Sequence, residues 1–247
     1  MSATLRSELH KQRSTRTNLG LVAAMVVLVL AAVLLHGLLL PADNVASADD
    51  QMEVVFGWGE VLGALFAALL GGLTFTAEFR YGTIRPTLLV TPRRGRVVIA
   101  KLLASLLVGA LFGVLAAAAA SIGASAALAA RGIGIEVSAG DYAVLVLGGA
   151  GAGALWGAIG AGVGAAVRLQ VPVLVGLSAW LLFVETVLIG DAELVGDIGR
   201  YTPGALGRAA SGQEPLVAPG LAVLLLALYA AAAAAAGWLA TTRRDVA

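Results

Sequence analysis

The stretch EFRYGTIRPTLLVTPRRGRVVIAK, Glu78–Lys101, separates two apolar segments that are each long enough to cross a lipid bilayer. It carries six basic residues and one acidic residue within 24 positions. A plain connection between two neighbouring spans needs far fewer residues. We therefore interpret this loop as a docking surface between spans two and three.

The composition places the chain among integral membrane proteins. Hydrophobic residues make up 60% and charged residues 13%, against about 45–50% and about 25% in soluble domains. The mean hydropathy is +0.94. The chain has no cysteine, which excludes disulfide bonds and thiolate metal sites.

The apolar segments predict an all-α membrane protein with six transmembrane helices in a single transmembrane domain, residues 1–247. A short interfacial segment, residues 1–18, comes before the first span. The loop 77–101 lies between spans two and three, and a longer loop, 190–215, joins spans five and six. The predicted spans cover residues 19–40, 54–76, 102–130, 142–167, 171–189 and 216–240.

Basic residues predict the orientation, because they are retained on the cytoplasmic side. With both termini inside, thirteen of the sixteen lysines and arginines are cytoplasmic, and only Arg131, Arg200 and Arg208 are outside. The excess of arginine over lysine and the abundant alanine and glycine are typical of a GC-rich bacterial genome. We expect a multi-pass protein of the bacterial cytoplasmic membrane.

The loop has its own predicted structure. Thr83 caps a short helix over residues 83–90, and Thr91-Pro92 is typical of the start of the next helix. The arginines at this corner either bind anionic lipid or an acidic protein surface, or only fix the orientation. They are Arg93, Arg94 and Arg96.

The segment before the first span places Leu5 and Leu9 one helical turn apart among basic residues. This spacing favours a short helix in the headgroup layer. The alternative is that the basic residues only enforce the orientation.

Together these features resemble the permease subunits of type-2 ATP-binding cassette (ABC) transporters. In that family the coupling loop runs from a glutamate at the end of span two, through Gly-Thr and Leu-Leu pairs, to a Thr/Ser-Pro-Arg/Lys motif. Glu8, Lys11, Arg13 and Arg16 resemble the family's segment before the first span. The matching loop positions are Glu78, Arg80, Gly82, Thr83, Leu88, Leu89, Thr91, Pro92, Arg93 and Arg94.

The resemblance implies the type-2 ABC exporter fold, with the loop helix contacting a separate ATPase subunit that binds ATP and Mg²⁺. It also implies a second permease subunit, identical or paralogous, surrounding membrane lipids and no nucleic acid. The chain itself has no Walker A motif, since its only lysines, Lys11 and Lys101, do not follow a glycine-rich loop. We therefore expect a non-enzymatic transport subunit without a cofactor or metal of its own.

Two carboxylates fall within the predicted spans, where a charge costs about 2.5–3.5 kcal/mol at mid-bilayer. Glu60 in span two and Glu185 in span five lie at similar depth near the outer side. They either form part of a pathway or gate with Trp58, Trp180 and Phe183, or they reach the interface or bond a neighbouring helix. The aromatic residues fit an interfacial belt equally well.

Span four carries small residues at four-residue spacing, which predicts close packing against another helix. They are Gly149, Gly153, Gly157, Ala161 and Ala165. The loop 190–215 is expected either to fold into short helices at the outer face, as the resemblance implies, or to be an exposed loop.

Two other functions compete with the ABC permease. Six spans divide into halves of three, as in many secondary transporters, and a scaffold subunit would use the same loop to bind a partner without moving a solute. An intramembrane enzyme is disfavoured, because the chain lacks converging acid, base or ligand groups. The substrate and the direction of transport do not follow from the sequence, although the family favours export.

Overall fold

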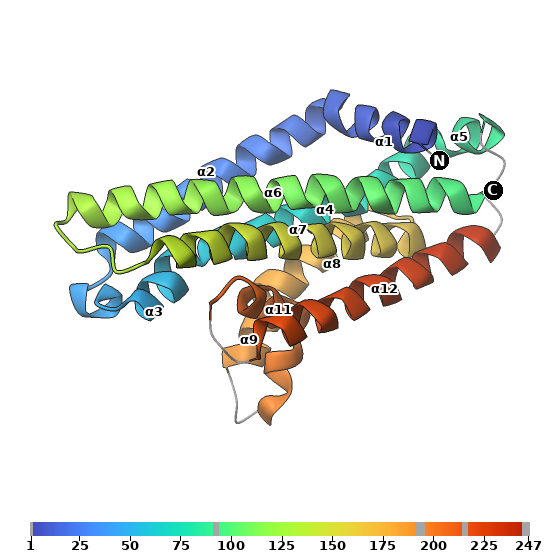
Figure 1. The fold of residues 1–247 in the computed structure, drawn as a ribbon. Helices are drawn as coiled ribbons and strands as arrows, with labels where there is room; N and C mark the ends of the chain where they lie inside the picture. The colour runs from blue at the N-terminus through green and yellow to red at the C-terminus, as the bar shows by residue number, and fades with distance from the viewer. Residues whose placement is uncertain (1, 91–93, 191–195, 214–216, 244–247) are drawn as a thin grey trace.

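The computed structural model describes residues 2–90, 94–190, 196–213 and 217–243, and this part of the chain contains no β-strand. Figure 1 shows a layered bundle in which long helices run side by side. The helical segments are α1 (Ser2–Ser14), α2 (Arg16–Leu39), η1 (Ala42–Val45), α3 (Ala48–Gln51), η2 (Met52–Phe56), α4 (Trp58–Arg80), α5 (Ile84–Val90), α6 (Arg94–Ala130), α7 (Ala139–Val167), α8 (Gln170–Ala179), η3 (Trp180–Val184), α9 (Glu185–Gly190), η4 (Gly196–Tyr201), α11 (Pro203–Ala210) and α12 (Pro219–Arg243).

Six helices among the described residues are long and apolar enough to cross a membrane. Two of them differ from the sequence prediction by more than three residues at an end. The second is continuous over Ala48–Arg80, so it begins before residue 54, and the third begins at Arg94 instead of 102. These extensions are more polar than the spans, which is why hydropathy alone did not include them. The architecture is that of a multi-pass membrane protein.

Helix α7 lies at the centre of the bundle between α6 and α4. A capping box starts it, in which the Ser138 hydroxyl accepts from the Asp141 N–H and the Asp141 carboxylate accepts from Ser138. On one face, a methyl group at Gly113 of α6 would collide with the carbonyl of Gly149. On the other face, one at Gly160 would collide with the carbonyl of Ala68 in α4. Gly149 of the predicted stripe thus lets α7 approach α6 closely, and Gly160, which is not part of that stripe, lets it approach α4.

The outer helices keep apolar faces exposed. Large apolar side chains on α2, α8 and α12 are uncovered, including Val27 at 64%, Val175 at 61% and Leu224 at 58%. Monomeric soluble proteins rarely expose contiguous apolar surface of this kind. These faces fit contact with lipid or with another membrane subunit.

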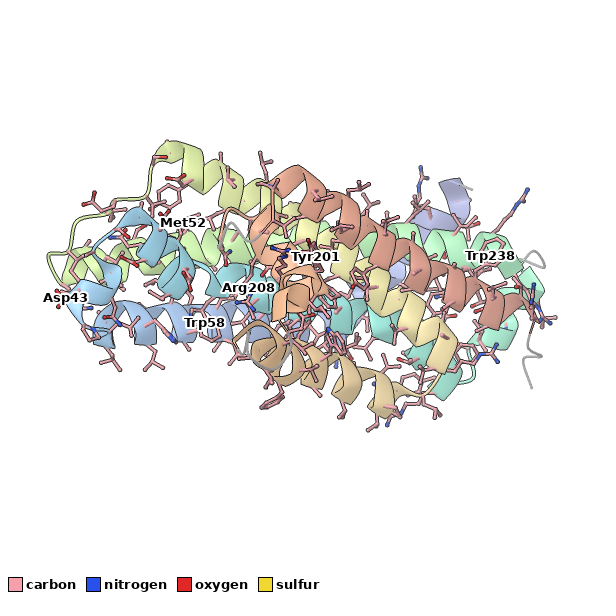
Figure 2. All side chains as sticks on the ribbon, turned by 90° about the horizontal axis from the view of Figure 1, so that it is seen from below. Asp43, Met52, Trp58, Tyr201, Arg208 and Trp238 are labelled. Atoms are coloured by element: carbon pink, nitrogen blue, oxygen red, sulfur yellow. The ribbon has the colours of Figure 1, made fainter. Side chains whose placement is uncertain are left out.

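The helices that bear on function lie in two places. At one end of the bundle, hereafter the α5 end, α1, α5 and the last turns of α12 come together (Figure 1). Along the bundle from there, η4 and α11 pack beside α9 and the first turns of α12. Figure 2 shows Tyr201 and Arg208 of this second region near the middle of one face, with Asp43 and Trp238 toward its opposite ends.

Candidate functional site

Helix α1 presents a polar face to the bundle. Glu8 and Gln12, one turn apart, are buried at 3% and 7% exposure, whereas Leu5 and Leu9 are only partly covered. The Gln12 side-chain amide donates to the Thr74 hydroxyl at 3.2 Å. The short helix predicted before the first span is present, and its charged face finds partners inside the protein. Its position in the headgroup layer stays a prediction.

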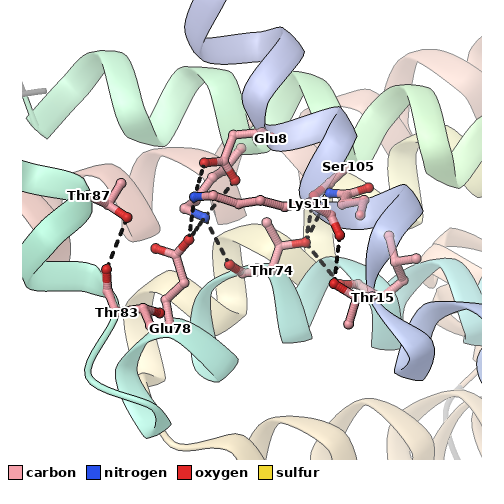
Figure 3. Close-up of polar contacts among 11 residues, drawn as sticks. Glu8, Lys11, Thr15, Thr74, Glu78, Thr83, Thr87 and Ser105 are labelled. Carbon is pink, nitrogen blue, oxygen red and sulfur yellow. Dashed lines mark hydrogen bonds and ion pairs between the residues drawn. The ribbon is translucent and has the colours of Figure 1, made fainter. Parts of the chain in front are cut away.

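Those partners form the charge cluster, which consists of Glu8, Lys11, Glu78 and Lys101 (Figure 3). The Lys101 ammonium donates to Glu8 Oε2 at 2.8 Å and to Glu78 Oε1 at 2.8 Å. Its third donor meets the Thr74 carbonyl at 3.2 Å. An ammonium group has three donors, so Lys101 is fully satisfied although its side chain is only 1% exposed.

Lys11 completes the cluster from its outer side. Its ammonium lies 2.7 Å from Glu8 Oε1 and 2.9 Å from Glu78 Oε1. Its side chain is 43% exposed, so water weakens these two ion pairs relative to those of Lys101. The cluster holds two positive and two negative groups and ties α1 to the last turns of α4 and the first turns of α6.

Two groups of the cluster, Glu8 and Lys11, have shifted pKa values. Burial raises the pKa of the Glu8 carboxyl group, but the charges and hydrogen bonds of Lys101 and Lys11 outweigh this effect and hold the pKa below its ordinary value of 4.5. Burial lowers the pKa of the Lys11 ammonium, but its bonds to Glu8 and Glu78 raise it above its ordinary 10.5. Glu8 therefore stabilises the fold above about pH 4.5, and Lys11 does so below about pH 10.5.

The predicted docking loop consists mainly of helix. After α4 ends, Gly82 adopts the left-handed backbone with φ of 69°, which glycine takes at little cost. Helix α5 follows, and the Thr87 hydroxyl donates to the Thr83 carbonyl at 3.0 Å. Leu89 is 82% exposed, and Arg80 donates to the Gln170 side chain at 3.0 Å. Among the predicted loop residues whose side chains the structure describes, only Glu78 enters the charge cluster.

For four other predicted loop residues the structure describes no side chain. Thr91, Pro92 and Arg93 lie outside the described residues, as does the side chain of Leu88. Arg94 is the first residue of α6.

The predicted carboxylates Glu60 and Glu185 are both buried, at 5% and 1% exposure, against α11. The Glu60 carboxylate packs on Gly207 and the Glu185 carboxylate on Gly204, so that a methyl group at either glycine would collide with it. The Trp180 indole N–H donates to Glu185 Oε1. Both carboxylates thus bond or pack against neighbouring elements and do not reach the molecular surface.

The three aromatic residues predicted to accompany this pair lie in different surroundings. Trp58 lies against His36, with ring centroids 4.9 Å apart, in a cavity of about 430 Å³ that also contains Arg208. Phe183 is 69% exposed and lines a different cavity. The Trp180 indole hydrogen-bonds a carboxylate of the pair, whereas Trp58 and Phe183 line two different cavities. A role of these five residues in a pathway or gate stays a prediction.

Each carboxylate follows a π-helical segment. Glu60 comes shortly after η2, and Glu185 directly follows η3. Such segments loosen the helical ladder and often mark functional sites. Within the described residues, no group of three metal-ligating side chains forms.

Sequence reasoning missed the role of Glu8, Lys11 and Lys101 as one buried cluster. The available signal was the placement of Glu78 and Lys101 at the bundle ends of adjacent spans, with a Glu8–Lys11 pair at i,i+3 nearby. The pairing needs the tertiary position of α1, which hydropathy does not contain.

Comparisons with known proteins give no family. No protein-family model matches the chain, and a search of curated proteins finds no match.

Proposed function

We propose that this chain is the permease subunit of an ABC transporter, with both termini and α5 in the bacterial cytoplasm. In this proposal, two permease subunits enclose the pathway, and α5 contacts a separate ATPase subunit. Closure of the ATPase subunits on ATP moves α5, and the movement passes into the spans. Export is the expected direction, by analogy with the family alone.

The observation that carries the proposal is the attachment of α5. This seven-residue helix, which exposes Leu89, is joined to α4 by the turn at Gly82 and precedes α6 in the chain. The charge cluster joins α4 and α6 to each other and to α1. A force on α5 would therefore reach spans two and three together. A loop that served only to connect two spans would not need a four-charge clamp in which Glu8, Glu78 and Lys101 are buried, because burying charges is costly unless they are paired.

A secondary transporter is the second candidate. The observation in its favour is that π-helical segments precede both intramembrane carboxylates, since interrupted helices and buried acids are typical of ion-coupled sites. This candidate requires transport driven by an ion gradient and no ATPase partner.

Co-purification from the native membrane distinguishes the two candidates. The tagged protein is isolated in mild detergent, and co-eluting proteins are identified together with ATPase activity. The proposal predicts a stoichiometric P-loop ATPase that is lost in Leu89→Asp, because a carboxylate would disrupt the exposed apolar contact. Ile135→Asp is the matched control, being 43% exposed on the connection between α6 and α7. An ATPase-free protein whose transport follows an ion gradient would favour the second candidate.

A further inference from the structure

A groove runs from the charge cluster into the bundle between α2, α4 and α8. Its polar part at the α5 end has a volume of about 440 Å³, and the adjoining apolar part has about 470 Å³. Thr17, Leu73 and Gln170 line both parts. The two cavities are therefore neighbouring sections of one groove, each within the size range of ligand sites.

The lining changes character along the groove. At the α5 end it carries hydroxyl and amide groups, including those of Thr15, Asn18 and Thr87. Farther along it is formed mainly by aliphatic and aromatic side chains, among them Leu21, Leu174 and Phe183 of three different elements. This change along one continuous groove matches a molecule with a polar head and an apolar tail.

The charges in the polar part select the head group. Glu8, Lys11, Glu78 and Lys101 all line it, and they pair with one another. They therefore leave no net charge to balance a charged ligand. A head group with a net charge would therefore find no counter-charge in the cluster, whereas a zwitterionic or uncharged head group can use the surrounding hydroxyl and amide groups.

We propose that this groove binds a single-tailed amphiphile with a zwitterionic or uncharged head group, the head at the charge cluster and the tail between α2, α4 and α8. As a statement about the transported substrate, the proposal rests on the proposed function. As a statement about binding, it stands on the groove alone.

The test uses the full chain in nanodiscs with a lysophosphatidylcholine that carries a photoreactive group on its tail. We expect saturable labelling that maps to the groove residues on α2, α4 and α8. Leu73→Trp, which fills the junction of the two parts, is expected to reduce labelling at least fivefold. Leu107→Trp is the matched control, because Leu107 is 54% exposed on α6 and lines neither part.

Three results would overturn the inference. The first is labelling spread evenly over the exposed helices, as for bulk lipid. The second is equal labelling in Leu73→Trp and the wild type. The third is that lysophosphatidylglycerol competes with the probe as well as unlabelled lysophosphatidylcholine does, which would refute the head-group preference. The two proposals fail separately. Saturable labelling without an ATPase partner would support the amphiphile site and contradict the proposed ABC permease function. An ATPase complex without labelling would support the permease function and contradict the amphiphile site.

Discussion

Replacing Lys101 with methionine tests the charge cluster most sharply. The substitution removes an ammonium group that is 1% exposed and serves Glu8, Glu78 and the Thr74 carbonyl. Methionine keeps most of the side-chain volume, so the main change is electrostatic. Two buried carboxylates then share one partly exposed lysine.

The expected cost is large. Removing one partner of a buried ion pair costs about 3–5 kcal/mol, and about 3 kcal/mol corresponds to a roughly 100-fold change in an equilibrium. We expect this change in the equilibrium between docked and released α1. Lys11→Met is the matched control, because its side chain is 43% exposed and exposed pairs contribute about 0.2–1 kcal/mol, at most about fivefold.

Limited trypsin cleavage after Arg13 reports the release of α1, because helix α1 must open before it is cut. When opening is fast relative to cleavage, the rate follows the open population. Mass spectrometry distinguishes this product from the product of cleavage after Lys11, a site that Lys11→Met lacks. Adding Glu78→Gln to Lys101→Met should restore part of the protection, since Lys11 then balances one carboxylate, that of Glu8, instead of two. Equal cleavage rates in Lys101→Met and Lys11→Met would refute the reasoning.

Three further predictions concern packing and pH. Gly113→Ala should destabilise the protein by about 1–3 kcal/mol in denaturant unfolding, because the added methyl group would collide with the α7 backbone. The control Gly151→Ala, at a position with open space around it, should be neutral or slightly stabilising. Gly207→Ala should displace α11 from Glu60 and increase hydrogen exchange in α11; unchanged exchange would contradict that packing. Lowering the pH from 6 to 3 should speed cleavage within α1 by an acid-tolerant protease, because protonation of Glu8 weakens the charge cluster. A flat profile, after correction for the protease's own pH dependence on an unfolded peptide, would show that Glu8 does not hold α1.

The sequence predicted the helical class and the six membrane-length helices, because long apolar runs depend only on local composition. It also placed a short helix before Val90, where α5 lies. It did not predict the burial of Glu8 and Lys101, since a charged residue near a span end has the same hydropathy whether it faces water or pairs inside the bundle. The separation of Trp58 from Phe183 likewise depends on helix rotation, which the weakly amphipathic spans do not encode.

Site-directed cross-linking from α5 tests the central claim most directly. The chain has no native cysteine, so Leu89→Cys provides a single reactive position that is 82% exposed in the wild type. Native membranes are treated with a thiol-directed cross-linker, and the products are identified by mass spectrometry. The account predicts a cross-link from residue 89 to a P-loop ATPase that changes in yield with ATP, and none from the control Ile135→Cys at the opposite end. Absence of any ATPase product at residue 89, with the cysteine shown to be reactive, would contradict the claim that α5 couples this protein to an ATPase.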